Sequence, residues 1–227
     1  MAYIQYEGVG ITAMSAAVPK RVIKNREYTE VFSVQEANDI VDKTGIEERR
    51  FSDVETCSSD LCFAAAEKLI ADNNINKEEV DLLVFISQTP DYRMPATACT
   101  LQYRLGLPNS TIAFDITLGC SAFLYGLSVV YGMMERSGLR KALLLDGETR
   151  SKVYSPRDRR SAFLFGDGGV AALIERDPKF GKSTFSLNTD GSRADLIMIP
   201  AGGYRKMSSA ETVVEKVIDE FGNMRSD

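Results

Sequence analysis

The chain has 227 residues, of which 44% are hydrophobic and 26% are charged, a composition typical of a globular protein rather than a disordered or fibrous one. A formal net charge of -5 argues against a nucleic-acid partner, which favours a basic surface. The first residues show no secretory signal, and the most apolar stretch, residues 122–134, is shorter than the ~20 residues of a membrane span. The four cysteines form no CxxC pair, so neither a disulfide framework nor a metal site is indicated. We therefore expect a cytoplasmic protein with no metal, no membrane partner and no nucleic-acid partner.

Short apolar runs alternate with segments of helical spacing along most of the chain. Strands are predicted for the ranges 3–14, 81–87, 111–117, 140–146, 169–174 and 183–187. Helices are predicted within 25–41, from 58 to about 73, and over 96–105 and 121–137. This alternation predicts parallel β-α-β units in a layered α/β fold. On these helices Cys62 and Cys99 are interpreted as small packing residues.

Two features organise the last third of the chain. The charged turn at residues 175–178 is predicted to separate a first half, 1–176, from the start of a second half, 177–227. Further on, Ser208-Ser-Ala-Glu211 has the pattern of a capping box. Apolar residues follow at helical spacing, so a helix ending at Gly222 is predicted there: Val213, Val214, Val217, Ile218 and Phe221.

Cys120 lies between a predicted strand and a helix that is apolar on nearly all sides. Such a helix belongs in the middle of a domain, and a cysteine at its first turn faces the positive end of the helix dipole. That position raises the thiolate fraction, and Gly119 permits a sharp turn. From spacing alone, an inert buried cysteine is the more frequent alternative.

Four segments in order favour a reactive Cys120 over an inert one. Asp115-Ile-Thr-Leu-Gly-Cys-Ser-Ala-Phe-Leu-Tyr-Gly-Leu127 resembles the nucleophile segment of the type III β-ketoacyl-acyl carrier protein synthases, members of the thiolase-like superfamily. Three further segments resemble family segments in the same order: Lys43-Thr-Gly-Ile-Glu-Glu-Arg-Arg50, Asp158-Arg159 with Phe165-Gly-Asp-Gly-Gly169, and Thr189-Asp-Gly-Ser-Arg-Ala-Asp195 with Pro200-Ala-Gly-Gly203. The resemblance implies a thiolase-like layered α-β-α-β-α fold, with the first half and the beginning of the second half present.

The resemblance also implies a reaction and its substrates. Cys120 would take an acyl group from acyl-CoA, and malonyl-acyl carrier protein would decarboxylate to an enolate that accepts it. The enzyme would be a homodimer, and it would use no cofactor besides these two thioester substrates. Two alternatives remain open: transfer of the acyl group to an amine or hydroxyl, and a non-catalytic partner subunit of the same fold.

The chain contains no histidine, whereas the family uses a histidine and an asparagine from its second half to stabilise the enolate. We expect the remainder of that half to be supplied by the same gene product or by a second polypeptide. A native protein of intact mass near 25.1 kDa with no co-purifying chain would contradict this expectation.

The resemblance assigns further positions around the substrate. Lys43 and Arg159 fall where family members place groups around the CoA nucleotide, with solvated surface charge as the equal alternative. Asp39 stands where many members have a tryptophan, and the chain has no tryptophan. Met94 matches a position that reaches across the dimer to line the partner's acyl pocket, unless it only fills an interface gap. The glycine-rich residues 165–169 are interpreted as a tight turn near the nucleophile.

Overall fold

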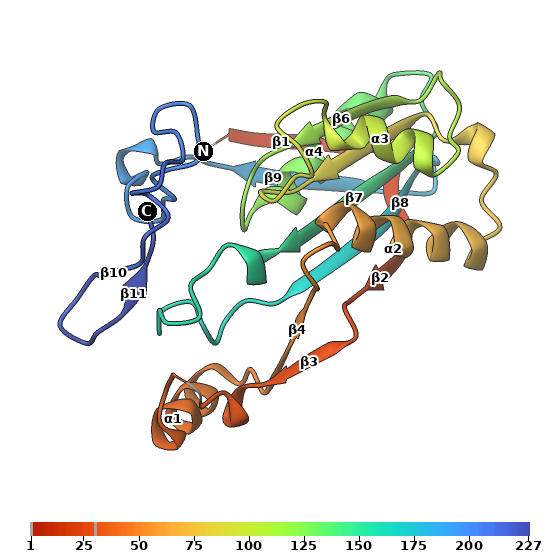
Figure 1. Ribbon diagram of the computed structural model, residues 1–227. Coiled ribbons are helices and arrows are strands. Elements are labelled where there is room, and N and C mark those ends of the chain that lie inside the picture. Colours follow the sequence, from red (N-terminus) through yellow and green to blue (C-terminus); the bar gives the residue numbers. More distant parts are fainter. Residues whose placement is uncertain (1, 30) are drawn as a thin grey trace. The chain divides into compact units, whose positions relative to one another are not determined.

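The computed structural model describes residues 2–29 and 31–227 (Figure 1). The chain divides into two compact units, each described by itself below. The first unit contains the residues up to 21 together with 50–149 and 167–187. The second contains residues 22–49, 150–166 and 188–227.

A five-stranded mixed sheet organises the first unit. Its strand order is β2 (Val9–Ala17), β8 (Asp167–Arg176), β7 (Lys141–Thr149), β5 (Leu82–Ile86) and β6 (Ile112–Ile116). β5 is parallel to both β6 and β7, whereas β8 is antiparallel to β7 and β2. All five residues of β5 are buried, as expected for a central strand covered on both faces.

Helices cover both faces of this sheet. α2 (Ser58–Asp72) and α3 (Thr97–Arg104) share a core with Leu83, Leu143 and Leu145. α4 (Ala122–Glu135) shares a second core with Val84 and Leu144. Because alternate residues of a strand point to opposite faces, the odd-numbered side chains of β5 and β7 meet α2 and α3, and the even-numbered ones meet α4. A short helix η2 (Lys77–Glu79) precedes β5.

Two glycines allow α2 to lie directly on the sheet. A Cβ at Gly169 would stand 2.5 Å from the backbone nitrogen of Cys62, and one at Gly147 would stand 2.5 Å from its sulfur. Cys62 is fully buried, which confirms its prediction as a core residue. The interpretation of residues 165–169 as a tight turn is wrong, because Gly168 and Gly169 lie inside β8 and serve helix-to-sheet packing.

The predicted strand over 3–14 is two strands that belong to different sheets. β1 (Ala2–Glu7) pairs antiparallel with β9 (Lys182–Leu187), and β2 starts after Gly8, whose φ is +73°. Only glycine adopts this conformation without strain, so the chain changes direction there. The Tyr6 hydroxyl lies 3.2 Å from the Ser128 hydroxyl of α4, which attaches the β1–β9 pair to that helix.

The second unit has a small core and little regular structure. Its elements are η1 (Asn25–Glu27), α1 (Val34–Thr44), η3 (Arg150–Lys152), η4 (Gly191–Arg193), β10 (Lys216–Val217) and β11 (Met224–Arg225). Phe32, Ala37, Ala162 and Phe163 form its buried cluster. The strands β3 (Arg21–Lys24) and β4 (Glu48–Phe51) pair in a further two-stranded sheet.

The helix predicted before Gly222 is wrong. Residues 210–213 form a turn, and Lys216–Val217 pairs with Met224–Arg225 in a short antiparallel ladder. Val213, Val214, Val217 and Phe221 are each more than half exposed. An amphipathic helix gains most of its stability from packing its apolar face, and β-branched residues add little intrinsic propensity. Without a packed face among the described residues, the spacing alone does not produce a helix.

Among residues 2–29 and 31–227, no helix has the length and apolar character needed to cross a membrane.

Candidate active site

Cys120 lies at the carboxyl edge of the parallel strands of the first unit. Ile86 of β5 is in register with Ile116 of β6 and Asp146 of β7, so these strands reach the edge together. Cys120 follows β6 in the turn that leads into α4, and it is exposed. The alternative of a buried cysteine is therefore wrong, and the reactivity of Cys120 stays a prediction. The carboxyl edge of parallel strands is where α/β proteins generally bind ligands.

The turn around Cys120 leaves its backbone donor available. The Ala122 N–H donates to the Gly119 carbonyl at 2.8 Å, and Ser121 caps α4 without a side-chain hydrogen bond. Within the described part of the chain, the Cys120 N–H meets no protein acceptor. At the start of α4 this N–H and the helix dipole favour negative charge, as the oxyanion of an acyl-transfer step requires.

A carboxylate from β7 holds the chain beside this turn. Glu148 accepts hydrogen bonds from the Gln88 N–H and from the Thr89 hydroxyl, both at 2.8 Å. The Thr89 hydroxyl in turn accepts from the Thr149 N–H at 3.0 Å. A Cβ at Gly119 would lie 3.2 Å from the Gln88 carboxamide, so the Gln88 side chain lies against the residue that precedes Cys120.

A second carboxylate from β6 caps α3. Asp115 accepts from the Thr97 and Ala98 N–H groups, each at 2.7 Å. These N–H groups belong to the first turn of α3, where the N-cap residue Ala96 has no side chain that can accept from them. The sequence shows a charged residue in an otherwise apolar strand, which indicates that it needs a partner but does not say which one.

Asp146 is a partly buried carboxylate on the same strand. It lies two residues before Glu148 and therefore projects to the same face of the sheet, the face that α4 covers. Burial, with a smaller contribution from the charge of Glu148, raises the pKa of Asp146 to about 6. Sequence reasoning assigned no role to Asp115, Asp146 or Glu148.

Met94 lies in the loop between β5 and α3 and is 82% exposed. Earlier in this loop, the Ser59 hydroxyl of α2 donates to Asp91 at 2.7 Å. Desolvation raises the pKa of Asp91, and the Ser59 bond offsets part of this effect. Cys99, predicted as a packing residue of α3, is instead exposed, because Thr97, Ala98 and Leu101 form the buried side of that short helix.

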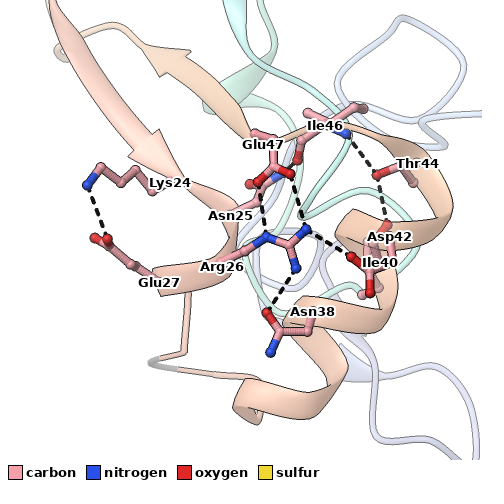
Figure 2. Close-up of polar contacts among 10 residues, drawn as sticks. All are labelled: Lys24, Asn25, Arg26, Glu27, Asn38, Ile40, Asp42, Thr44, Ile46 and Glu47. Carbon is pink, nitrogen blue, oxygen red and sulfur yellow. Dashed lines mark hydrogen bonds and ion pairs between the residues drawn. The ribbon is translucent and has the colours of Figure 1, made fainter.

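Lys43 lies in the last turn of α1 and is exposed. Figure 2 shows Arg26 bonded to Asn38 and Asp42 of this helix and to Glu47 beyond its end. Gly45 adopts the left-handed conformation at φ +71°, and Thr44 donates to the Ile40 carbonyl at 2.8 Å. Arg26 binds Glu47 at 3.1 Å and Asp42 at 2.8 Å, and both carboxylates raise its pKa. Several residues of the segment from Lys43 to Arg50 therefore have a structural role at the end of α1.

Arg159 is bound by several groups of the second unit. Its guanidinium forms an ion pair with Glu36 of α1 at 2.9 Å, donates to the Phe221 carbonyl at 2.6 Å and lies 5.2 Å from the Phe32 ring centre. Bonds from Ser33, and then the one from Arg159, lower the pKa of Glu36. The neighbouring arginines also meet carboxylates: Arg157 pairs with Glu215, and Arg160 with Asp219.

The predicted site residues thus divide between the units. Cys120 and Met94 belong to the first unit, and Lys43 and Arg159 to the second. Within the second unit, Lys43 is seven residues beyond Glu36 on α1. That spacing places the two side chains on one face of the helix, about 10 Å apart along its axis.

Comparisons with known proteins identify the family. The sequence profile of the family described as 3-oxoacyl-[acyl-carrier-protein (ACP)] synthase III matches residues 114–191, which include Cys120. The β-ketoacyl-[acyl-carrier-protein] synthase III of Desulfitobacterium hafniense (strain Y51) is 36% identical over 212 residues, covering 92% of this chain and 63% of that protein. The chain belongs to the type III β-ketoacyl-acyl carrier protein synthase family.

Other members of the family support the fold. The synthase III of Aliarcobacter butzleri (strain RM4018) is 35% identical over 221 residues, covering 96% of this chain and 64% of that protein. The crystal structure of the 3-oxoacyl-(acyl-carrier protein) synthase of Burkholderia xenovorans LB400 superposes with a TM-score of 0.87 at 35% identity, covering 89% of this chain and 58% of that one. The predicted thiolase-like α/β fold is confirmed. The chain spans somewhat less than two thirds of the length of these type III synthases.

Proposed function

We propose that this type III synthase relative is an acyltransferase in which Cys120 carries the acyl group. The exposed position of Cys120 between the carboxyl edge of β6 and the start of α4 is the observation that supports this most strongly. The thiolate attacks the carbonyl carbon of acyl-CoA, the oxyanion faces the Cys120 N–H, and the CoA thiolate leaves. The product of this half-reaction is an acyl-cysteine thioester.

The second half-reaction forms the carbon–carbon bond. Malonyl-acyl carrier protein loses CO₂, and the resulting enolate carbon attacks the acyl-cysteine carbonyl. The Cys120 thiolate is then expelled, and the β-ketoacyl group remains on the carrier protein. The two thioester substrates supply every group that is transferred, so the proposed chemistry needs no further cofactor.

Mass spectrometry of the native protein tests this function. Incubation with a short acyl-CoA is expected to add the acyl mass to the peptide that contains Cys120, and the Cys120→Ser variant is expected to remain unmodified. Cys99, which is also exposed, provides the control for non-specific thiol acylation. Equal labelling of Cys99 and Cys120 would contradict the assignment.

We further propose that Lys43 and Arg159 bind the CoA nucleotide. Lys43 is exposed, and the Arg159 side chain retains a third of its accessible surface beside Glu36. Both cations suit the phosphates of the nucleotide. Lys43→Ala and Arg159→Ala are expected to raise the KM for acyl-CoA with little change in kcat. The proposal fails if KM is unchanged in both variants.

A homodimer is the assembly we propose. β6 is an edge strand of the five-stranded sheet, and Leu124 and Val129 of α4 are 55% and 40% exposed. A second copy would cover this edge and these side chains, and Met94 would then reach the partner's acyl pocket. Sedimentation should give the mass of two copies, and Met94→Ala should change which acyl chain lengths are accepted. A monomeric enzyme with unchanged chain-length preference would contradict the proposal.

We propose residues 1–176 as the first half of the thiolase-like fold and 177–227 as the start of the second. This boundary is supported by the turn at Asp177, whose N–H donates to the Gly8 carbonyl at 2.9 Å. Before the turn, β8 belongs to the five-stranded sheet, whereas β9 after it pairs with β1. We also propose a cytoplasmic location, which the four free cysteines support.

A further inference from the structure

The side chain of Glu148 holds the start of the loop after β5, at Gln88 and Thr89, which lies beside the proposed nucleophile. The last bond of the parallel ladder at this edge runs from the Ser87 N–H to the Ile116 carbonyl at 3.2 Å. The next backbone donor, the Gln88 N–H, is taken by Glu148. The carboxylate therefore extends the pairing of β5 with a side chain where the strand itself has ended.

Each carboxylate oxygen of Glu148 accepts a different hydrogen bond. One accepts from Gln88 and the other from the Thr89 hydroxyl, both at 2.8 Å. From the opposite face, the Ser58 hydroxyl of α2 donates to the Thr89 carbonyl at 2.7 Å. The Thr89 hydroxyl also accepts from the Thr149 N–H, and it donates its own proton to Glu148 because a carboxylate can only accept. The backbone at residues 88 and 89 is thus fixed by charge-assisted and neutral hydrogen bonds together.

The fixed backbone aims the Gln88 carboxamide at the nucleophile turn. A Cβ at Gly119 would lie 3.2 Å from both the nitrogen and the oxygen of this carboxamide, so the carboxamide lies beside Gly119, next to the space that a side chain there would take. Gly119 in turn accepts the Ala122 N–H bond at 2.8 Å that closes the turn around Cys120. Glu148, Gln88 and Gly119 form a continuous series of contacts that ends at the residue before the cysteine.

We infer that Glu148 is a positioning residue for Cys120, acting through Gln88 and the Cys120 turn. This inference rests on the proposed role of Cys120 as the acyl acceptor. An ordered turn keeps the exposed sulfur just before α4, in one place from which it can attack the acyl carbonyl carbon. Loss of the carboxylate releases Gln88, loosens the turn and makes Cys120 less reactive.

The test measures alkylation of each cysteine by iodoacetamide in the native protein, with peptide mass spectrometry as the readout. Cys99 is exposed on α3 and serves as the internal rate standard, and fully buried Cys62 reports local unfolding. Glu148→Gln keeps the size of the side chain but replaces one acceptor oxygen by a donor. Gln88→Ala removes the proposed link without changing charge. Glu79→Gln, in which a carboxylate is removed from the opposite edge of the same sheet, is the matched control.

Glu148→Gln and Gln88→Ala should each lower the ratio of Cys120 to Cys99 alkylation rates by about fivefold or more. The double variant should be no slower than either single variant, because both changes break one series of contacts. Cys62 should stay protected, and Glu79→Gln should leave the ratio unchanged. An unchanged ratio in Glu148→Gln, additive effects in the double variant, or exposure of Cys62 accompanying the loss would each overturn the inference. Failure of wild-type Cys120 to accept an acyl group would instead refute the proposed function, which this alkylation ratio does not measure.

Discussion

The contact between α2 and β8 predicts very different effects for two adjacent glycines. A Cβ at Gly169 would stand 2.5 Å from the Cys62 nitrogen and 2.6 Å from the Leu61 carbonyl carbon, both backbone atoms of α2. A Cβ at Gly168 would meet nothing closer than 3.7 Å. Comfortable carbon contacts begin near ~3.5 Å, so Gly169→Ala must move α2 by about 1 Å or distort β8.

Such overpacking against backbone should cost about 3 kcal/mol. For a chain of this size, that corresponds to a fall in Tm of about 6–12 °C. Gly168→Ala should stay within about 1 kcal/mol of the parent, because the methyl fits and a less flexible unfolded chain offsets small losses. Urea unfolding and thermal melts of both variants measure the difference. Equal stabilities for the two variants would refute the close packing of α2 on β8.

Three further predictions follow from single side chains. Asp115→Asn should destabilise the protein by about 1–3 kcal/mol in urea unfolding, because it removes a charged cap from α3, whereas exposed Asp72→Asn should change little. The Asp146 pKa of about 6 lies above the unfolded value near ~4, so the folded state loses stability as pH rises from about 4 to about 6. Asp146→Asn should therefore raise the free energy of unfolding by about 2–3 kcal/mol above pH 6 and leave it unchanged below pH 4. A stability difference between variant and wild type that does not depend on pH would contradict this. Brief alkylation should modify Cys99 and Cys120 but spare Cys62, whose burial raises its pKa, and early labelling of Cys62 would contradict the packing.

Local patterns predicted the elements that have a continuous core. The apolar run of β5 was found because burial on both faces leaves no polar positions. The apolar helix after Cys120 was also found, although Leu124 and Val129 on it are exposed among the described residues. The pattern at residues 208–221 gave an incorrect helix prediction, because apolar residues at helical spacing stabilise a helix only when another surface covers its apolar face. Cys99 shows the same limit, because which side of an eight-residue helix is buried depends on its neighbours.

The site required both resemblance and tertiary structure. Cys120 was identified from its segment, and spacing alone favoured an inert cysteine. The roles of Asp115 and Glu148 were beyond reach, because strand register sets their partners. Glu148 meets Gln88 from 60 positions away in sequence, and Asp115 meets Thr97 from 18.

Intact mass with peptide mapping tests the proposed acyl transfer to Cys120. The native protein, together with any polypeptide that co-purifies, is incubated with acyl-CoA and then with malonyl-acyl carrier protein. We expect an acyl adduct on Cys120 that disappears when the malonyl donor is added, with no adduct in Cys120→Ser. A protein that never carries the acyl group on Cys120, or that loses none of its adduct in Cys120→Ser, would contradict it.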